Sequence, residues 1–114
     1  MSEETVFHAI LKREIPARIA YEDADVLVIH DIRPKATTHL LFIPKRFVAS
    51  IADIDSTTAD IPGMLIAQAK QFAETHNIRG YRLQCNVGKE GGQEVPYLHL
   101  HFLSDQALQA QKAV

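Results

Sequence analysis

Apolar residues recur along this chain with two different spacings, and each spacing predicts a different kind of element. Within residues 6–12, and again within residues 60–76, apolar side chains are three or four positions apart, which is the spacing of one face of an α-helix. Pro62 is compatible with the second helix because it would lie in the first turn, where its missing N–H costs no hydrogen bond. The pattern predicts a short N-terminal helix and one long helix.

Other segments are short, apolar and rich in the residues that strands favour. They span residues 19–22, 26–30, 39–43, 81–87 and 97–103. Short connections join most of these segments, and only one substantial helix separates them. We therefore expect a mainly antiparallel α+β domain.

Length and charge narrow the class of protein. With 114 residues, the chain is expected to form a single domain, 1–114, with a short N-terminal extension over residues 1–5 and a C-terminal tail over residues 104–114. A formal net charge of -2 argues against a protein that binds nucleic acid through a basic surface. We expect a small-molecule partner and no nucleic acid.

The expected cellular setting follows from cysteine usage and from the apolar runs. The chain has one cysteine, Cys85, and so has no pair for an internal disulfide, which favours a reducing compartment. Its acidic first residues do not resemble a secretory signal peptide, and no apolar run approaches the roughly 20 residues that cross a bilayer. We expect a cytoplasmic protein with no membrane partner.

Candidate chemistry is concentrated in residues 97–103, which alternate between apolar side chains and histidines. Because successive side chains of a strand point to opposite faces, Tyr97, His99 and His101 would share the face that is turned away from the core. Two imidazoles on that face have three interpretations. They could act in nucleophilic catalysis, they could simply face water, or they could bind a zinc ion together with His39 as the third ligand. The residues alone leave these three interpretations open.

A second feature supports catalysis on an anionic substrate. The loop before this strand contains Gly91 and Gly92, and glycines let backbone N–H groups approach an anion closely.

The chain resembles the histidine triad family, in its Hint-like purine nucleoside phosphoramidase branch. The resemblance is carried by eight segments, which follow one another in the order of the family. These segments are residues 7, 13–17, 30–34, 38–45, 80–82, 86, 91–95 and 99–103.

The chain departs from the family pattern at two places. Tyr97 stands where the first histidine of the family motif is expected, and Ser104 and Asp105 replace the usual glycine pair after the last strand. The positions of the central and final motif histidines are kept by His99 and His101.

The resemblance implies a fold, an activity and an assembly. The fold is an α+β, HIT-like fold with a five-stranded, mainly antiparallel sheet, one long helix and a short N-terminal helix; two copies form a homodimer with a ten-stranded sheet. The activity is hydrolysis of the P–N bond, or the acyl-phosphate bond, of purine nucleoside 5'-phosphoramidates or acyl-AMP through a nucleotidyl-histidine intermediate. No cofactor and no metal are implied.

The resemblance also implies catalytic roles. His99 would be the nucleophile, because a neutral imidazole is available near pH 7 and a carbonyl bonded to Nδ1 would direct Nε2 at phosphorus. His101 would bind the phosphoryl oxygens or the leaving group, and His39 would orient the nucleophile from behind. The Gln93 amide would stabilise charge on the phosphoryl oxygens.

The nucleotide-binding residues are likewise carried over from the resemblance. Asp31 would accept hydrogen bonds from the ribose hydroxyls. The remaining predicted contacts are Ile32, Phe7 and Ile10 at the base, Asn86, Gly92, Gln93 and Glu94 around the phosphate, and the Tyr97 hydroxyl beside the nucleophile.

Two other functions are compatible with the same fold. Tyr97 favours a nucleotide-binding sensor or scaffold that turns over weakly or not at all. A dinucleoside polyphosphate hydrolase would belong to a neighbouring branch of the family, although the Gly-Gly-Gln segment and the short chain favour the phosphoramidase branch.

Overall fold

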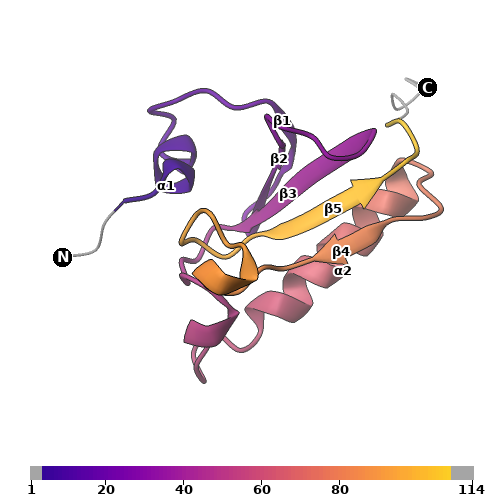
Figure 1. The fold of residues 1–114 in the computed structure, drawn as a ribbon. Coiled ribbons are helices and arrows are strands. Elements are labelled where there is room, and N and C mark those ends of the chain that lie inside the picture. Colours follow the sequence, from indigo (N-terminus) through magenta and orange to yellow (C-terminus); the bar gives the residue numbers. More distant parts are fainter. Residues whose placement is uncertain (1–3, 109–114) are drawn as a thin grey trace.

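The computed structural model describes residues 4–108 and contains both predicted helices and all the predicted strands (Figure 1). Two 3-10 helices, Ile51–Asp53 and Lys89–Gly91, lie in connections. The main elements are α1 (Val6–Leu11), β1 (Ile19–Glu22), β2 (Val26–His30), β3 (Thr38–Pro44), α2 (Ile61–Thr75), β4 (Arg82–Gln84) and β5 (Leu100–Ser104).

The strands form one antiparallel five-stranded sheet in the order β1-β2-β3-β5-β4. The chain places α2 between β3 and β4, and β5 then returns to lie between those two strands. This arrangement confirms the predicted α+β class. The ten-stranded sheet expected of a homodimer would need a second copy paired along one edge and stays a prediction.

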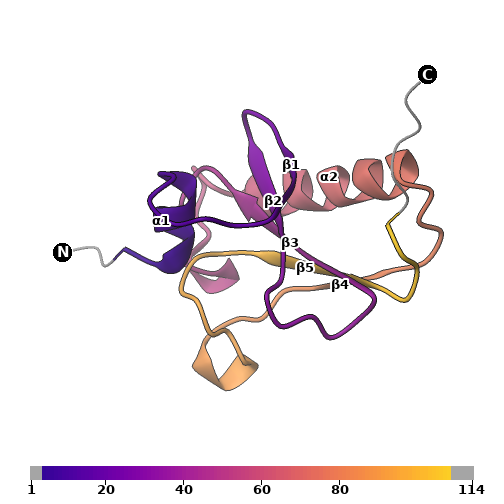
Figure 2. The same ribbon diagram turned by 90° about the horizontal axis from the view of Figure 1, so that it is seen from above.

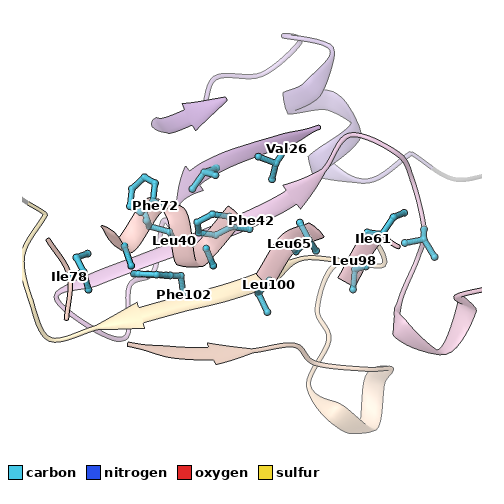
Figure 3. Close-up of a cluster of buried hydrophobic side chains, with 14 residues drawn as sticks. Val26, Leu40, Phe42, Ile61, Leu65, Phe72, Ile78, Leu98, Leu100 and Phe102 are labelled. Carbon is cyan, nitrogen blue, oxygen red and sulfur yellow. The ribbon is translucent and has the colours of Figure 1, made fainter. Parts of the chain in front are cut away.

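One face of the sheet packs against α2. Alternate residues of β2, β3 and β5 point to this face, and the helix contributes the apolar stripe that the sequence predicted (Figure 3). Pro62 lies in the first turn of α2, as expected. The main buried side chains are Val26, Val28, Leu40, Phe42, Ile61, Leu65, Phe72, Leu98, Leu100 and Phe102.

The intervening residues of the same strands point to the other face, where α1 supplies the cover. Figure 2 shows α2 running along the sheet and α1 beside one end of it. The second apolar cluster joins two residues of α1 to the sheet and to Tyr97; it consists of Phe7, Ile10, Leu27, Ile29, Leu41, Ile43 and Tyr97. The histidines expected to carry chemistry lie on this side.

The structure corrects the bounds of the last two strands. β4 is confined to Arg82–Gln84, and β5 begins at Leu100 instead of at Tyr97. β5 begins late because Tyr97 N–H donates to the Val95 carbonyl and Leu98 N–H donates to the Val48 carbonyl, instead of to neighbouring strands. The predicted alternation of faces nevertheless continues through these residues.

The ends of the chain also differ from expectation. Ser104 closes β5, so the tail begins one residue later than predicted. Thr5, assigned to the N-terminal extension, caps α1 through a capping box with His8. Residues 1–3 and 109–114, which include most of the predicted tail, lie outside the described residues. Within residues 4–108, no helix is long and apolar enough to cross a membrane.

Candidate active site

The His99 ring is held in one tautomer. Its Nδ1 lies 2.7 Å from the backbone carbonyl oxygen of Tyr97, and because a carbonyl only accepts, Nδ1 carries the proton. In the neutral ring, Nε2 then keeps its lone pair, which is what a nitrogen nucleophile requires. The expected carbonyl contact on Nδ1 is present. The Phe7 ring packs edge-on against the imidazole, with centroids 5.0 Å apart.

A chain of hydrogen bonds fixes the tautomers of His39 and His101. The backbone N–H of Lys35 donates to Nδ1 of His39 over 3.1 Å, so a neutral His39 carries its proton on Nε2. That Nε2 lies 2.9 Å from Nδ1 of His101 and 3.4 Å from an Asp31 carboxylate oxygen. Nδ1 of His101 therefore accepts, and its proton lies on Nε2. His101 presents an N–H donor next to His99, with ring centroids 4.9 Å apart.

Burial keeps these rings uncharged at neutral pH. Burial lowers the pKa of His99, an effect that the hydrogen bond to the Tyr97 carbonyl partly opposes. Burial, and then the nearby His99 and His39, lower the pKa of His101 to about 4. Burial also lowers the pKa of His39, against the attraction of Asp31. The site thus combines an uncharged His99, whose Nε2 has a free lone pair, with an uncharged N–H donor on His101.

Asp31 and Ile32 lie directly after β2, next to the histidines. One Asp31 oxygen accepts the backbone N–H of Arg33 over 2.8 Å, while the other faces His39. The Asp31 side chain is 19% exposed, and the Ile32 side chain stands out from the surface at 90% exposed. Both residues are therefore accessible to a nucleoside that approaches the histidines, and their predicted contacts with ribose and base stay predictions.

The loop between β4 and β5 is held together by its own backbone hydrogen bonds. The backbone N–H groups of Gly91 and Gln93 both donate to the Gly88 carbonyl, and that of Gly92 donates to the Lys89 carbonyl. These are the donors that the sequence predicted to face an anion. In this structure they are used within the loop, because its two glycines with positive φ fold the turn back on itself.

The Gln93 amide is also used inside the protein. Its Nε2 donates to the carbonyls of Ala49 and Val95 over 2.7 and 3.0 Å, and its Oε1 accepts the N–H of Gly88 over 2.9 Å. Both amide hydrogens are therefore occupied, and the structure gives this side chain the role of holding the loop. Its predicted direct contact with the phosphoryl oxygens would require that it release these bonds.

Asn86 and Gly92 fit against each other in the same loop. Asn86 Nδ2 donates to the Gly91 carbonyl over 2.7 Å. Gly92 has a φ of +84°, and a β-carbon there would lie 3.3 Å from Asn86 Nδ2, so conformation and space both favour glycine. Glu94 is exposed, and its negative charge is one of the influences that oppose the lowering of the His99 pKa by burial. The phosphate contacts predicted for these residues stay predictions.

Three residues that we predicted to contact the nucleotide are buried instead. Phe7, Ile10 and Tyr97 are only 5%, 6% and 1% exposed. The Tyr97 hydroxyl donates to the Pro44 carbonyl over 2.6 Å, so the prediction that this hydroxyl lies beside the nucleophile is wrong. The physical reason is that the ring joins the apolar cluster beneath α1, and only the Tyr97 carbonyl reaches His99.

A metal ion would have a different set of ligands from the one that the sequence suggested. Among the described residues, Asp31, His39 and His101 have ligand atoms within 4.8 Å of one another, whereas His99 is not in this group. A metal on Nε2 of His39 would have to displace the proton there while the Lys35 N–H still occupies Nδ1. The hydrogen bonds therefore favour a proton at this point.

The sequence did not reveal the backbone groups that make the site rigid. These are the N–H of Lys35 and the carbonyls of Pro44 and Ala49, each of which binds a side chain of the site. Every residue has such groups, so nothing in a sequence marks the few that the fold brings into position.

Comparison with known proteins finds a matching family model and a relative of similar length. The family model described as "Scavenger mRNA decapping enzyme C-term binding" matches residues 4–113. The purine nucleoside phosphoramidase of Escherichia coli (strain K12) is 40% identical over 110 residues, which cover 95% of this chain and 92% of that protein.

Solved structures agree with the sequence relatives. A HIT family hydrolase from Legionella pneumophila Philadelphia 1 is 40% identical, with a TM-score of 0.83 over 90% of this chain and 94% of that chain. A histidine triad protein from Clostridium difficile is 33% identical, with a TM-score of 0.85 over 98% of this chain and 100% of that chain.

Proposed function

This chain belongs to the histidine triad family, and from that premise we propose that it is a purine nucleoside phosphoramidase that uses His99 as its nucleophile. The substrate class is purine nucleoside 5'-phosphoramidates, with acyl-AMP as a second class cleaved at the acyl-phosphate bond. The observation that carries the proposal is the 2.7 Å contact between His99 Nδ1 and the Tyr97 carbonyl, because it leaves Nε2 unprotonated. The name of the Escherichia coli relative supports the same activity.

In the first step, the Nε2 lone pair of His99 attacks the phosphorus. A P–Nε2 bond forms as the P–N bond of the substrate breaks, which leaves the His99 ring as a positively charged nucleotidyl-imidazolium. The leaving nitrogen takes a proton from solvent water and departs as the amine. Burial assists this step, since it lowers the pKa of His99 and keeps the ring in its nucleophilic form near pH 7.

His101 stabilises the charge that grows on the phosphoryl oxygens. Its Nε2–H is a fixed donor, because Nδ1 is bonded to His39. With a pKa of about 4, the ring is uncharged at neutral pH and acts as a hydrogen-bond donor instead of as an acid. In the second step, water attacks the phosphorus and gives up a proton to the solvent as the P–Nε2 bond breaks, which releases neutral His99 and the nucleoside monophosphate.

Asp31 and Ile32 bind the nucleoside in this proposal. A carboxylate that accepts two ribose hydroxyls explains a preference for ribonucleotides, and the Ile32 side chain, 90% exposed, provides apolar surface for a purine. The same carboxylate also faces His39, and His39 is hydrogen-bonded to His101. Asp31 would therefore both bind the ribose and help to orient His101.

The test is hydrolysis of a fluorogenic adenosine phosphoramidate, with and without a chelator, by the wild type and by His99→Ala. We expect His99→Ala to lower kcat/KM at least about 1,000-fold without unfolding the protein, because the covalent route is lost. His30→Ala is the matched control: His30 ends β2, outside the His39–His101–His99 chain, and this variant should keep wild-type activity.

Different outcomes separate the alternatives. A His99→Ala variant with most of the activity would refute the nucleophile. Adenosine monophosphate binding without P–N cleavage would support a nucleotide-binding sensor or scaffold. Faster cleavage of a dinucleoside polyphosphate than of the phosphoramidate would support a dinucleoside polyphosphate hydrolase. Mass spectrometry of the wild type, quenched and digested under alkaline conditions because a P–N bond to histidine is labile in acid, should find the nucleotidyl adduct on the peptide that contains His99.

A further inference from the structure

Tyr97 stands where the family pattern has a histidine, and its surroundings anchor it firmly. The side chain is 1% exposed, and its hydroxyl donates over 2.6 Å to the carbonyl of Pro44, the last residue of β3. The rings of Phe7, His8 and Phe47 pack around it at centroid distances of 6.1, 4.8 and 5.0 Å. Tyr97 is thus fixed at its tip by a hydrogen bond and along its sides by aromatic packing.

The backbone of the same residue determines how the nucleophile lies. Its carbonyl accepts the Nδ1 proton of His99 over 2.7 Å. Tyr97 precedes β5, so no ladder of strand hydrogen bonds fixes the direction of this carbonyl. The N–H of Tyr97 bonds locally to the Val95 carbonyl. The side chain is therefore the part of the residue that ties this segment to the sheet.

A histidine at position 97 could not reproduce this anchor. The nitrogens of an imidazole lie closer to the backbone than a phenolic hydroxyl does, so they do not reach the Pro44 carbonyl from the same ring position. The Pro44 carbonyl is buried at the end of a strand, where an acceptor without a donor is costly. The length of the tyrosine side chain is therefore what allows the Pro44 carbonyl to be hydrogen-bonded.

We propose that Tyr97 is a positioning residue: the bond between its hydroxyl and the Pro44 carbonyl fixes the backbone carbonyl that holds His99 in the Nδ1–H tautomer. The effect on catalysis rests on the proposed function, because it assumes that Nε2 of His99 is the attacking atom. The effect on the tautomer does not depend on any substrate.

The test compares Tyr97→Phe with Tyr21→Phe by ¹⁵N NMR of the histidine rings and by steady-state kinetics. Tyr21 is a matched control, since its hydroxyl also donates a hydrogen bond, to Asp23 over 2.8 Å, from an exposed position on β1. We expect the wild type and Tyr21→Phe to show His99 protonated on Nδ1. Tyr97→Phe should show a mixture of tautomers and a kcat about tenfold lower, with KM changed by less than about twofold.

Two results would overturn this inference. One is a Tyr97→Phe protein with the wild-type His99 tautomer and kcat; the other is a wild-type His99 protonated on Nε2. If Tyr97→Phe does not fold, Tyr97→His, whose ring nitrogens do not reach the Pro44 carbonyl, takes its place, and an unchanged His99 tautomer and kcat there would also overturn the inference. Failure of the wild type to cleave a phosphoramidate would refute the proposed function and leave the tautomer measurement valid.

Discussion

The two faces of the sheet are built from the same strands, one residue out of step, yet they are stabilised in different ways. The face that packs on α2 is an apolar cluster of 14 buried residues. The face beneath α1 has a smaller apolar cluster, of seven residues, next to a set of hydrogen-bonded histidines. Among the described residues, no buried side-chain nitrogen or oxygen lacks a hydrogen-bond partner.

This difference separates stability from chemistry. Apolar packing has no direction, so the α2 face stabilises the fold whatever the exact angles of its side chains. Hydrogen bonds have direction, so the histidine face sets which nitrogen carries each proton. Substitutions on the α2 face should lower the free energy of unfolding with little effect on kcat. Substitutions of the histidines should lower kcat/KM and have a smaller effect on the free energy of unfolding.

The largest expected effect on stability comes from Phe102→Ala on the α2 face. Phe102 is 0% exposed and stacks on Tyr81, with centroids 4.7 Å apart. Removing it should lower the free energy of unfolding by about 4 kcal/mol, measured by urea titration, with kcat of the folded fraction little changed. Ile66→Ala, at a half-exposed position on α2, should cost less than about 1 kcal/mol. Equal losses in the two variants would contradict the core assignment.

His101→Ala is the corresponding change on the other face. It removes the N–H donor that the His39 contact fixes, and kcat/KM for an adenosine phosphoramidate should fall about 100-fold, equivalent to about 2.7 kcal/mol of transition-state stabilisation. His101→Gln, which retains an N–H donor, should recover part of the loss. Wild-type kinetics in His101→Ala would show that another group stabilises the phosphoryl charge.

The fold was largely predictable because it depends on periodicity. Helical spacing located α1 and α2, and alternation placed Leu98, Leu100 and Phe102 on one face. The start of β5 was not predictable, because the extended residues before it bond to Val48 and Val95 instead of to a strand. Nothing in the apolar pattern distinguishes an extended segment from a paired one.

The candidate site was predictable in its residue types but not in its connections. The alternating histidines and Asp31 were evident from the sequence, and the structure brings them together with His39. The directions of Tyr97 and Gln93 were not evident, since each side chain bonds to a backbone carbonyl that is distant in sequence. These contacts depend on the completed fold.

The smallest of these effects is a dependence of stability on pH that originates on the histidine face. The pKa of His101 is about 4 in the folded protein, against about 6.5 for an unperturbed histidine, so the unfolded chain binds more protons between these values. The stabilisation is therefore complete above pH 6.5 and is lost as the pH falls toward 4. Between pH 7 and pH 5, wild type should lose about 2 kcal/mol more unfolding free energy than His101→Gln, in which position 101 cannot titrate. Acidic groups that titrate at lower pH are common to both proteins and cancel in the difference. Parallel urea midpoints for the two proteins across this range would mean that His101 has the same pKa in the folded and unfolded states, and the hydrogen-bond chain from Lys35 to His101 would then be incorrect.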